Sequence, residues 1–444
     1  MPVDIVIRNV TVVDPGLTMR ILPSHDVAVS GNRITAVGPA GTVSDPADRT
    51  IDGRGMVLLP GLINAHAHAA MVLFRGAAED VPVEAWFNDI IWPMESRLTA
   101  EDVYWGTLLA AAEMIESGVT TVADHYLHAD RVAEAIASSG MRGHVAWTMF
   151  GQEASAELDR SARFAAAWDG SAGGRIRVWL GPHSPYICTP EFLREVAAEA
   201  GRLGLGSHLH VAETAQQVAL CRRQYGVSPF RLLEQVGLMN HPLLCAHAAH
   251  PGEDDLDLLA AHPAGVAHCP KTFLKLAAGI APVTAMRQRG VPLGLGSDGA
   301  ASNNTLDIFE QMRLAAMLQK HQTGDPQVVP TGDALAMATT GGAAVLRQEH
   351  HLGRVAEGFL ADLILVRIDG VHVQPVHDLT AALVYSVRAA DVDTVIVDGR
   401  VLMEGRRLLT IDKAEVQREV TARVSRLIQR QPAARIETYP GAQP

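Results

Sequence analysis

Residues 60–68 read PGLINAHAH, and this stretch decides how the chain folds. The apolar run Val57–Leu59 leads into it, and such a run is typical of a strand covered on both faces. Side chains alternate across a strand, so His66 and His68 point to the same side. Two neutral imidazoles side by side provide half of the ligands of a first-row metal site. A lone His-x-His pair is equally compatible with two ordinary histidines at a strand end, so the rest of the chain has to decide.

The composition excludes several classes of protein. The chain has 444 residues, of which 48% are hydrophobic and 19% charged, as in a soluble globular protein. Its net charge of -12 argues against a nucleic-acid partner or an anionic membrane surface. No apolar run is long enough to span a bilayer, and no cationic segment followed by an apolar one opens the chain. The four cysteines form no Cys-x-x-Cys pair, which fits a reducing compartment, so we expect a cytoplasmic protein.

The middle of the chain, residues 59–352, alternates short apolar strands with Ala- and Leu-rich helical stretches. The eight expected strands are residues 57–66, 119–125, 144–148, 176–183, 206–211, 243–247, 265–269 and 292–298. Eight strands alternating with helices indicate an α/β fold of the (β/α)8 TIM-barrel type. An open doubly wound sheet is the nearest competitor, but no Gly-x-Gly-x-x-Gly turn follows the first strand.

Both ends of the chain carry strand-like segments that do not alternate with long helical stretches. These segments are residues 3–13, 26–29, 33–37 and 50–57 near the start, and 361–367, 392–397 and 401–403 near the end. A charged segment with helical periodicity, residues 412–430, closes the chain. We interpret residues 1–58 and 353–444 as the two parts of a small β-sandwich domain, with the metal-dependent hydrolase barrel between them.

Polar side chains stand at the expected carboxyl ends of the barrel strands, where (β/α)8 barrels carry their chemistry. They are His66, His68, His125, His183, His210, Glu213, His247 and Asp298. Buried polar groups without partners are costly, and strand ends in a packed core prefer apolar residues. Because these residues come from different strands, the pattern predicts that they converge on one functional site.

Four of these residues have the donor atoms of a metal site: His66, His68, His210 and Asp298. Three nitrogens and one oxygen suit Zn²⁺, or Fe²⁺, with an open position for water. A metal in such a site lowers the pKa of its water towards neutrality.

Three residues are candidates for moving protons. Asp298 could take a proton from the water, and His247 could hydrogen-bond the resulting hydroxide. Glu213 lies three residues after His210 and could pass a proton to the substrate if burial raises its pKa.

Two other residues near the expected site, His208 and Cys269, also have structural interpretations. His208 shares a face with His210, one layer deeper, and is equally compatible with a partner of a metal ligand and with a core residue. Cys269 is interpreted as a small core residue rather than a nucleophile, because the sequence places no base beside it.

Taken together, these motifs resemble the amidohydrolase superfamily. The resemblance rests on residues 60–68, HVAET at 210–214, His247, GSDGAASNN at 296–304 and GRVAEG at 353–358, and it covers nearly the whole chain. The most similar branch is the 5-methylthioadenosine/S-adenosylhomocysteine deaminases, with guanine and cytosine deaminases and triazine hydrolases as relatives. The resemblance implies one Zn²⁺ on His66, His68, His210 and Asp298. It implies no carbamylated lysine, since the fourth strand ends at 181–184 without one.

The branch also implies contacts with a substrate. His183 stands in a His-Ser-Pro-Tyr motif whose histidine contacts the purine, and Glu95 matches an acidic residue that binds ribose hydroxyls. Trp86 could wall the same pocket. Hydrophobic packing under a long loop is an equally good interpretation of Trp86 and Trp92.

The chain departs from this branch in two places. The branch has arginines after the third strand that hold an amino-acid carboxylate, and residues 146–153 contain none, which favours a neutral or aromatic substrate. Arg160 and Arg163, the nearest arginines, look like helix-surface residues. Relatives have Ser-Asn before Leu-Lys in the seventh-strand motif, whereas residues 270–276 read PKTFLKL, so we expect an altered pocket floor.

The sequence therefore predicts a zinc-dependent aminohydrolase that removes ammonia from an aminated N-heterocycle, best a 6-aminopurine nucleoside of the adenosine or methylthioadenosine type. One alternative is a hydrolase that releases chloride or an alkylamine from a triazine-like ring. The other is a non-catalytic scaffold, against which the intact set of polar residues argues. The expected partner is a small heterocyclic substrate, and the long helices are compatible with a homodimer.

Overall fold

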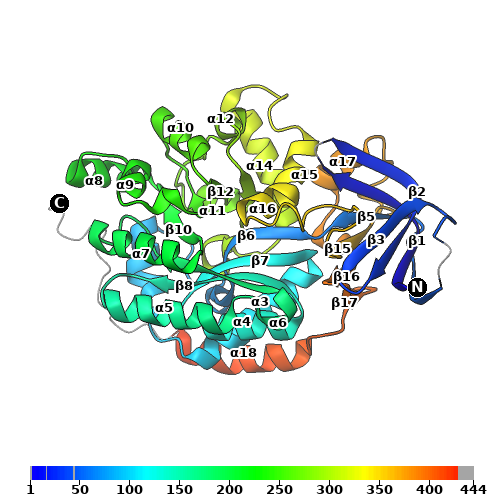
Figure 1. Cartoon of the computed structure of the whole chain (residues 1–444), viewed down its shortest axis with the longest axis horizontal. Coiled ribbons are helices and arrows are strands. Elements are labelled where there is room, and N and C mark those ends of the chain that lie inside the picture. Colours follow the sequence, from blue (N-terminus) through cyan, green and yellow to red (C-terminus); the bar gives the residue numbers. More distant parts are fainter. Residues whose placement is uncertain (1–2, 17, 44–45, 429–444) are drawn as a thin grey trace.

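The chain folds into a (β/α)8 barrel with a second sheet at one end of it (Figure 1). The computed structural model describes residues 3–16, 18–43 and 46–428. No helix in these three ranges is long and apolar enough to cross a membrane.

The barrel strands are all parallel to their neighbours. They are β6 (Leu62–His68), β7 (Val119–Tyr126), β8 (Arg142–Met149), β9 (Ile176–Pro182), β10 (Ser207–Val211), β11 (Leu243–His247), β12 (Ala264–His268), β13 (Leu293–Leu295) and β14 (Asp298–Gly299). The eighth strand is interrupted at residues 296–297: β13 pairs with β12, and β14 pairs with β6. The two parts of the eighth strand therefore join both edges of the sheet through residues 296–297, in line with the predicted barrel.

Helices cover the outside of this ring. The longer ones are α3 (Ala100–Glu116), α4 (Ala129–Ser139), α5 (Ala154–Trp168), α7 (Pro190–Leu203), α8 (Ala215–Tyr225) and α14 (Ile308–Thr323). Local sequence explains their starts. Thr99 and Asp102 form a capping box at α3, and the Thr189 side chain caps α7, which begins with a proline. The last helix, α18 (Lys413–Leu427), packs on α3; residues 429–430 of the expected helix lie outside the described residues.

Strands from both ends of the chain form the second sheet. They are β1 (Val3–Pro15), β2 (Met19–Ser30), β3 (Arg33–Pro39), β4 (Ala47–Asp52), β5 (Met56–Pro60), β15 (Leu363–Arg367), β16 (Val392–Val397), β17 (Arg400–Glu404) and β18 (Arg407–Leu408). The antiparallel pair β5–β15 joins the two halves, as the sequence predicted. Their inner side chains, including Ile7, Val27 and Ile396, form an apolar core separate from that of the barrel.

The expected strand at residues 57–66 is wrong, because it is two strands in two sheets. Pro60 pairs with Leu363 in the second sheet, whereas Leu62 donates to the carbonyl of Gly118 and begins the barrel. Gly61 lies between the two strands, where the chain passes from one sheet to the other. Only glycine fits there, because a Cβ would lie 2.1 Å from Thr120 Oγ1. Apolar character continues through both strands, so hydrophobicity alone did not reveal the break.

A buried ion cluster ties the second sheet to the amino ends of the barrel strands. Arg142 opens β8, and its guanidinium donates to both carboxylate oxygens of Asp362 at 2.9 and 3.1 Å. It also donates to Asp398 at 3.0 Å, and all three side chains are largely buried. This junction lies at the opposite end of the strands from the expected site.

We expect Arg142→Met to lower the free energy of unfolding by about 3–5 kcal/mol, because it leaves two buried carboxylates without their cation. The urea midpoint of unfolding measures this effect. Arg177→Met is the matched control, since its ion pair with Asp169 is exposed and worth about 0–1 kcal/mol. Equal midpoints for the two variants would contradict the role of the cluster.

Candidate active site

The predicted polar residues meet in a cavity at the carboxyl ends of the barrel strands. The cavity has about 1010 Å³ of open space, part of it continuous with solvent. Its lining includes His68, Trp86, Glu95, His125, His183, His210, Glu213, His247 and Asp298. His66 lies one layer deeper and is fully buried. The predicted convergence is therefore present in the fold.

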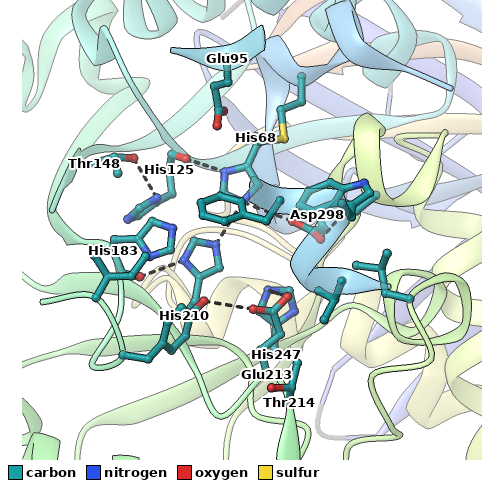
Figure 2. Close-up of a pocket in the computed structure, with 18 of the residues that line it drawn as sticks. His68, Glu95, His125, Thr148, His183, His210, Glu213, Thr214, His247 and Asp298 are labelled. Carbon is teal, nitrogen blue, oxygen red and sulfur yellow. Dashed lines mark hydrogen bonds and ion pairs between the residues drawn. The ribbon is translucent and has the colours of Figure 1, made fainter. Parts of the chain in front are cut away.

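His66, His68 and Asp298 form one close group of donor atoms, and His210 adjoins it through both histidines. Figure 2 shows how His68, His210 and Asp298 lie. His66 Nε2 and His68 Nε2 lie 3.5 and 3.3 Å from Asp298 Oδ1. His210 Nε2 lies 3.1 Å from His68 Nε2. Alternation along β6 brings the first two histidines to one side, and the pairing of β14 with β6 brings in the carboxylate.

Backbone carbonyls orient two of these imidazoles. His68 Nδ1 donates to the carbonyl of His125 at 2.6 Å, and His210 Nδ1 donates to that of His183 at 2.9 Å. A carbonyl can only accept, so each ring carries a proton on Nδ1, and in the neutral form of the ring Nε2 keeps a lone pair that a metal can bind. Both Nε2 atoms face the centre of the cluster.

Two hydroxyl groups orient Asp298. Thr272 Oγ1 and Ser302 Oγ donate to its Oδ2 at 3.0 and 2.7 Å, which leaves Oδ1 facing the histidines. Burial opposes ionisation of this carboxyl, but the neighbouring imidazoles of His66 and His68 outweigh it and hold its pKa well below the usual range. Asp298 therefore presents a negative charge to the cluster.

The electrostatics of the cluster fit a bound cation. Burial lowers the pKa of His66 to about 3. Burial also disfavours a charged His68, but Asp298 outweighs it and raises the pKa of His68 to about 9, so the site holds a positive charge beside the carboxylate. His66 Nε2 is buried, and its hydrogen-bonding capacity is unsatisfied in the described part of the chain. Three nitrogens, one carboxylate oxygen and this demand for positive charge match a first-row divalent metal.

Glu213 stands on the turn between β10 and α8, beside the cluster. Its Oε2 accepts a hydrogen bond from the Tyr186 hydroxyl at 3.0 Å, and its Oε1 lies 4.0 Å from His247 Nε2. Ala212 and His247 have φ angles of 50° and 73°, which L-residues rarely adopt. This strained backbone aims Glu213 and His247 at the same part of the cavity (Figure 2).

The far wall of the cavity is made by the segment before α3. Glu95 ends the short helix α2 (Trp92–Glu95), and burial raises the pKa of its carboxyl, with Tyr126 and His68 opposing. Trp86 lines the cavity and donates from Nε1 to the carbonyl of Ala301 at 3.3 Å. Trp92, by contrast, packs against Phe87 and Phe150, in line with the hydrophobic interpretation.

His183 and His125 form the side of the cavity next to β8. The ring of His183 stacks on Phe150 with centroids 5.3 Å apart, and burial lowers its pKa to about 3, so it is neutral. His125 Nδ1 lies 3.0 Å from Thr148 Oγ1. Both rings present uncharged polar edges to a ligand.

The segment 270–276, where we expect an altered pocket floor, contacts the site mainly through residues behind the cavity. Lys271 bonds to Glu310 and Thr305, and Phe273 packs beneath His247 with ring centroids 5.7 Å apart. Leu276 is the member of this segment that lines the cavity. Within this segment, Thr272 hydrogen-bonds Asp298 and Phe273 packs against His247, so both contact the site without lining the cavity.

Sequence reasoning missed several contributors. Tyr186 was visible in the His-Ser-Pro-Tyr motif, but nothing in the sequence paired it with Glu213, 27 residues away. Thr272 and Ser302 lie on different sides of Asp298 in sequence and meet at one oxygen. Short-range patterns carry no signal for such contacts.

We expect the purified protein to bind one divalent metal ion per chain and Asp298→Asn to lose most of it, because the variant removes the only negative charge among the four donor groups. Elemental analysis after dialysis measures the content. Asp257→Asn, at an exposed ion pair with Arg289, is the control and should retain the metal. Full occupancy in Asp298→Asn would contradict this assignment.

Comparison with known proteins agrees with the geometry. Residues 57–402 match the Amidohydrolase family. A 5-methylthioadenosine/S-adenosylhomocysteine deaminase of Pelotomaculum thermopropionicum is 46% identical over 432 residues, 96% of this chain and 100% of that protein. The crystal structure of an adenosine deaminase from Xanthomonas campestris with bound zinc superposes with a TM-score of 0.93 at 33% identity, covering 96% and 99% of the two chains. That of a zinc-complexed atrazine chlorohydrolase from Arthrobacter aurescens gives a TM-score of 0.83 at 28% identity, covering 96% and 100%.

Proposed function

We propose, from the premise that this chain belongs to the amidohydrolase family, that it is a zinc-dependent deaminase of a neutral 6-aminopurine nucleoside of the adenosine or methylthioadenosine type. The observation that carries the proposal is the convergence of three imidazoles and Asp298 beside Glu213, in a cavity that no lysine or arginine of the described residues lines. The names of the similar proteins supply the reaction class.

The proposed metal ligands are His66, His68, His210 and Asp298, and the donor set suits Zn²⁺, with Fe²⁺ as the alternative. When bound, the metal supplies a water whose pKa is lowered enough to be a nucleophile at neutral pH.

The protein's own groups then move the protons. With Oδ2 held by two hydroxyls, Asp298 accepts a proton from the attacking water through Oδ1. Glu213, steadied by Tyr186, donates a proton to the ring nitrogen next to the carbon that bears the amine. His247 hydrogen-bonds the attacking oxygen from the other side. Attack at that carbon and loss of ammonia give the ring carbonyl, and water and ammonia balance the reaction.

Three further residues are proposed to hold the nucleoside. His183 contacts the purine with its neutral ring, and Glu95 accepts hydrogen bonds from the ribose hydroxyls. Trp86, fixed by its bond to the carbonyl of Ala301, covers the sugar from above. All three line the same cavity as Glu213, which supports a ligand that reaches from one to the other.

The charges of the cavity favour a neutral tail on the nucleoside. Its charged lining groups are carboxylates, including Glu84 and Glu95, and its apolar ones include Phe87 and Ile187. Arg160, the nearest arginine after the third strand, instead lies over the Trp147 ring, 5.4 Å from its centroid. The amino-acid carboxylate of S-adenosylhomocysteine would therefore lose its water without gaining a cation.

We expect ammonia release from adenosine or methylthioadenosine to exceed that from S-adenosylhomocysteine by about 10- to 100-fold in kcat/KM, the effect of about 1–3 kcal/mol for an unpaired polar group. A coupled ammonia assay on the zinc-loaded protein measures it. Equal or faster turnover of S-adenosylhomocysteine would overturn the neutral-tail proposal. A chlorotriazine belongs in the same panel, and chloride release from it would move the function to the triazine hydrolases.

Glu213→Gln should keep the metal but lose about 10²- to 10⁴-fold in kcat, because the amide retains the shape of the side chain and cannot donate the proton of a carboxylic acid. Steady-state kinetics with parallel metal analysis separates these effects. The surface variant Glu234→Gln, which removes an ion pair with Arg231, should match the wild type. Near-normal turnover in Glu213→Gln would exclude the proton-transfer role.

A further inference from the structure

The three imidazoles proposed to bind the metal are oriented in two different ways. His68 and His210 each donate from Nδ1 to a backbone carbonyl. His66 has its Nδ1 2.8 Å from Nε2 of another side chain, His208. The orientation of His66 is thus the one that depends on a replaceable side chain.

The geometry places the proton between these two rings. His66 Nε2 faces Asp298 Oδ1 and must keep its lone pair for a metal, so the His66 proton is on Nδ1. His208 Nε2 therefore accepts the hydrogen bond. The two rings stand nearly edge to face, 5.0 Å apart with an interplanar angle of 74°, which suits a bond between the ring edge and a nitrogen.

Packing holds His208 in this position. Its side chain is buried, and its ring lies 5.3 Å from that of His125, which in turn contacts Thr148. A buried imidazole is costly unless a hydrogen bond compensates, and an apolar side chain would fill the same space at lower cost. The bond to His66 gives the imidazole a physical reason to be there.

We propose that His208 is a positioning residue that holds His66 in the tautomer and ring orientation needed for metal binding, an inference that rests on the proposed metal site. Asp298 is held by two hydroxyls, so the loss of one leaves the other. His66 has a single orienting partner among its described contacts. The retention of the metal by the whole site therefore depends on His208 more than on any other residue that is not itself a ligand.

The test compares zinc release from three full-length variants. His208→Leu removes the acceptor, whereas in His208→Gln the amide oxygen can replace Nε2 as acceptor. His144→Leu is the matched control: His144 is also a buried barrel histidine, next to Trp179, and neither of its ring nitrogens has a hydrogen-bond partner in the described part of the chain.

A chromophoric chelator then measures the rate and extent of zinc release. We expect His208→Leu to bind zinc about 10- to 100-fold more weakly, His208→Gln to recover most of the affinity, and His144→Leu to match the wild type. The visible spectrum of the cobalt-substituted protein should change in His208→Leu and remain wild-type in His208→Gln.

Equal zinc affinity in His208→Leu and the wild type would overturn the positioning role, and so would equal weakening in His208→Leu and His144→Leu. A folded His208→Gln that is as weak as His208→Leu would do the same. These results are independent of turnover. A wild type that binds zinc but releases no ammonia from any nucleoside would overturn the proposed function and leave the role of His208 standing.

Discussion

The pairing of β14 with β6 is the constraint on which the site depends. It closes the barrel, and its register sets Asp298 opposite Ala67, between His66 and His68. Asn64 secures this register, since it accepts from the Ser297 backbone at 2.9 Å and donates to the Ser297 hydroxyl at 2.7 Å. A shift of one residue would turn the donor side chains to the other face. The same strand pairing therefore closes the barrel and brings Asp298 to the histidines of β6.

The site combines a rigid frame with local strain. Asp298, His247 and Ala212 all have positive φ, at the ends of three different strands. Such conformations persist only where the surroundings impose them, and here the barrel does so. The strain lets side chains leave the regular alternation of a strand and turn into the cavity. It explains how Glu213 and His247 reach the same space as the histidines of β6.

The groups that orient the donor cluster come from three sources with different sensitivity to substitution. Backbone carbonyls orient His68 and His210, hydroxyls of Thr272 and Ser302 orient Asp298, and His208 orients His66. Of these groups, only the backbone carbonyls remain in place when the side chain of their residue is substituted. The opposite end of the barrel carries the ion cluster of Arg142, so the groups that stabilise the fold and those that shape the site are spatially separate.

The sequence by itself determined the barrel, the two-ended second sheet and the residues of the donor cluster. Strand periodicity and the position of polar residues at strand ends are local signals, and His66, His68, His210 and Asp298 each stand at or near the end of an expected strand. Only the tertiary structure decided the change of sheet at Gly61, the contact of Tyr186 with Glu213, the hold of Thr272 on Asp298 and the bond between His66 and His208. These contacts join residues from 26 to 142 positions apart or depend on space that a neighbouring strand leaves free, and no local pattern encodes such distances.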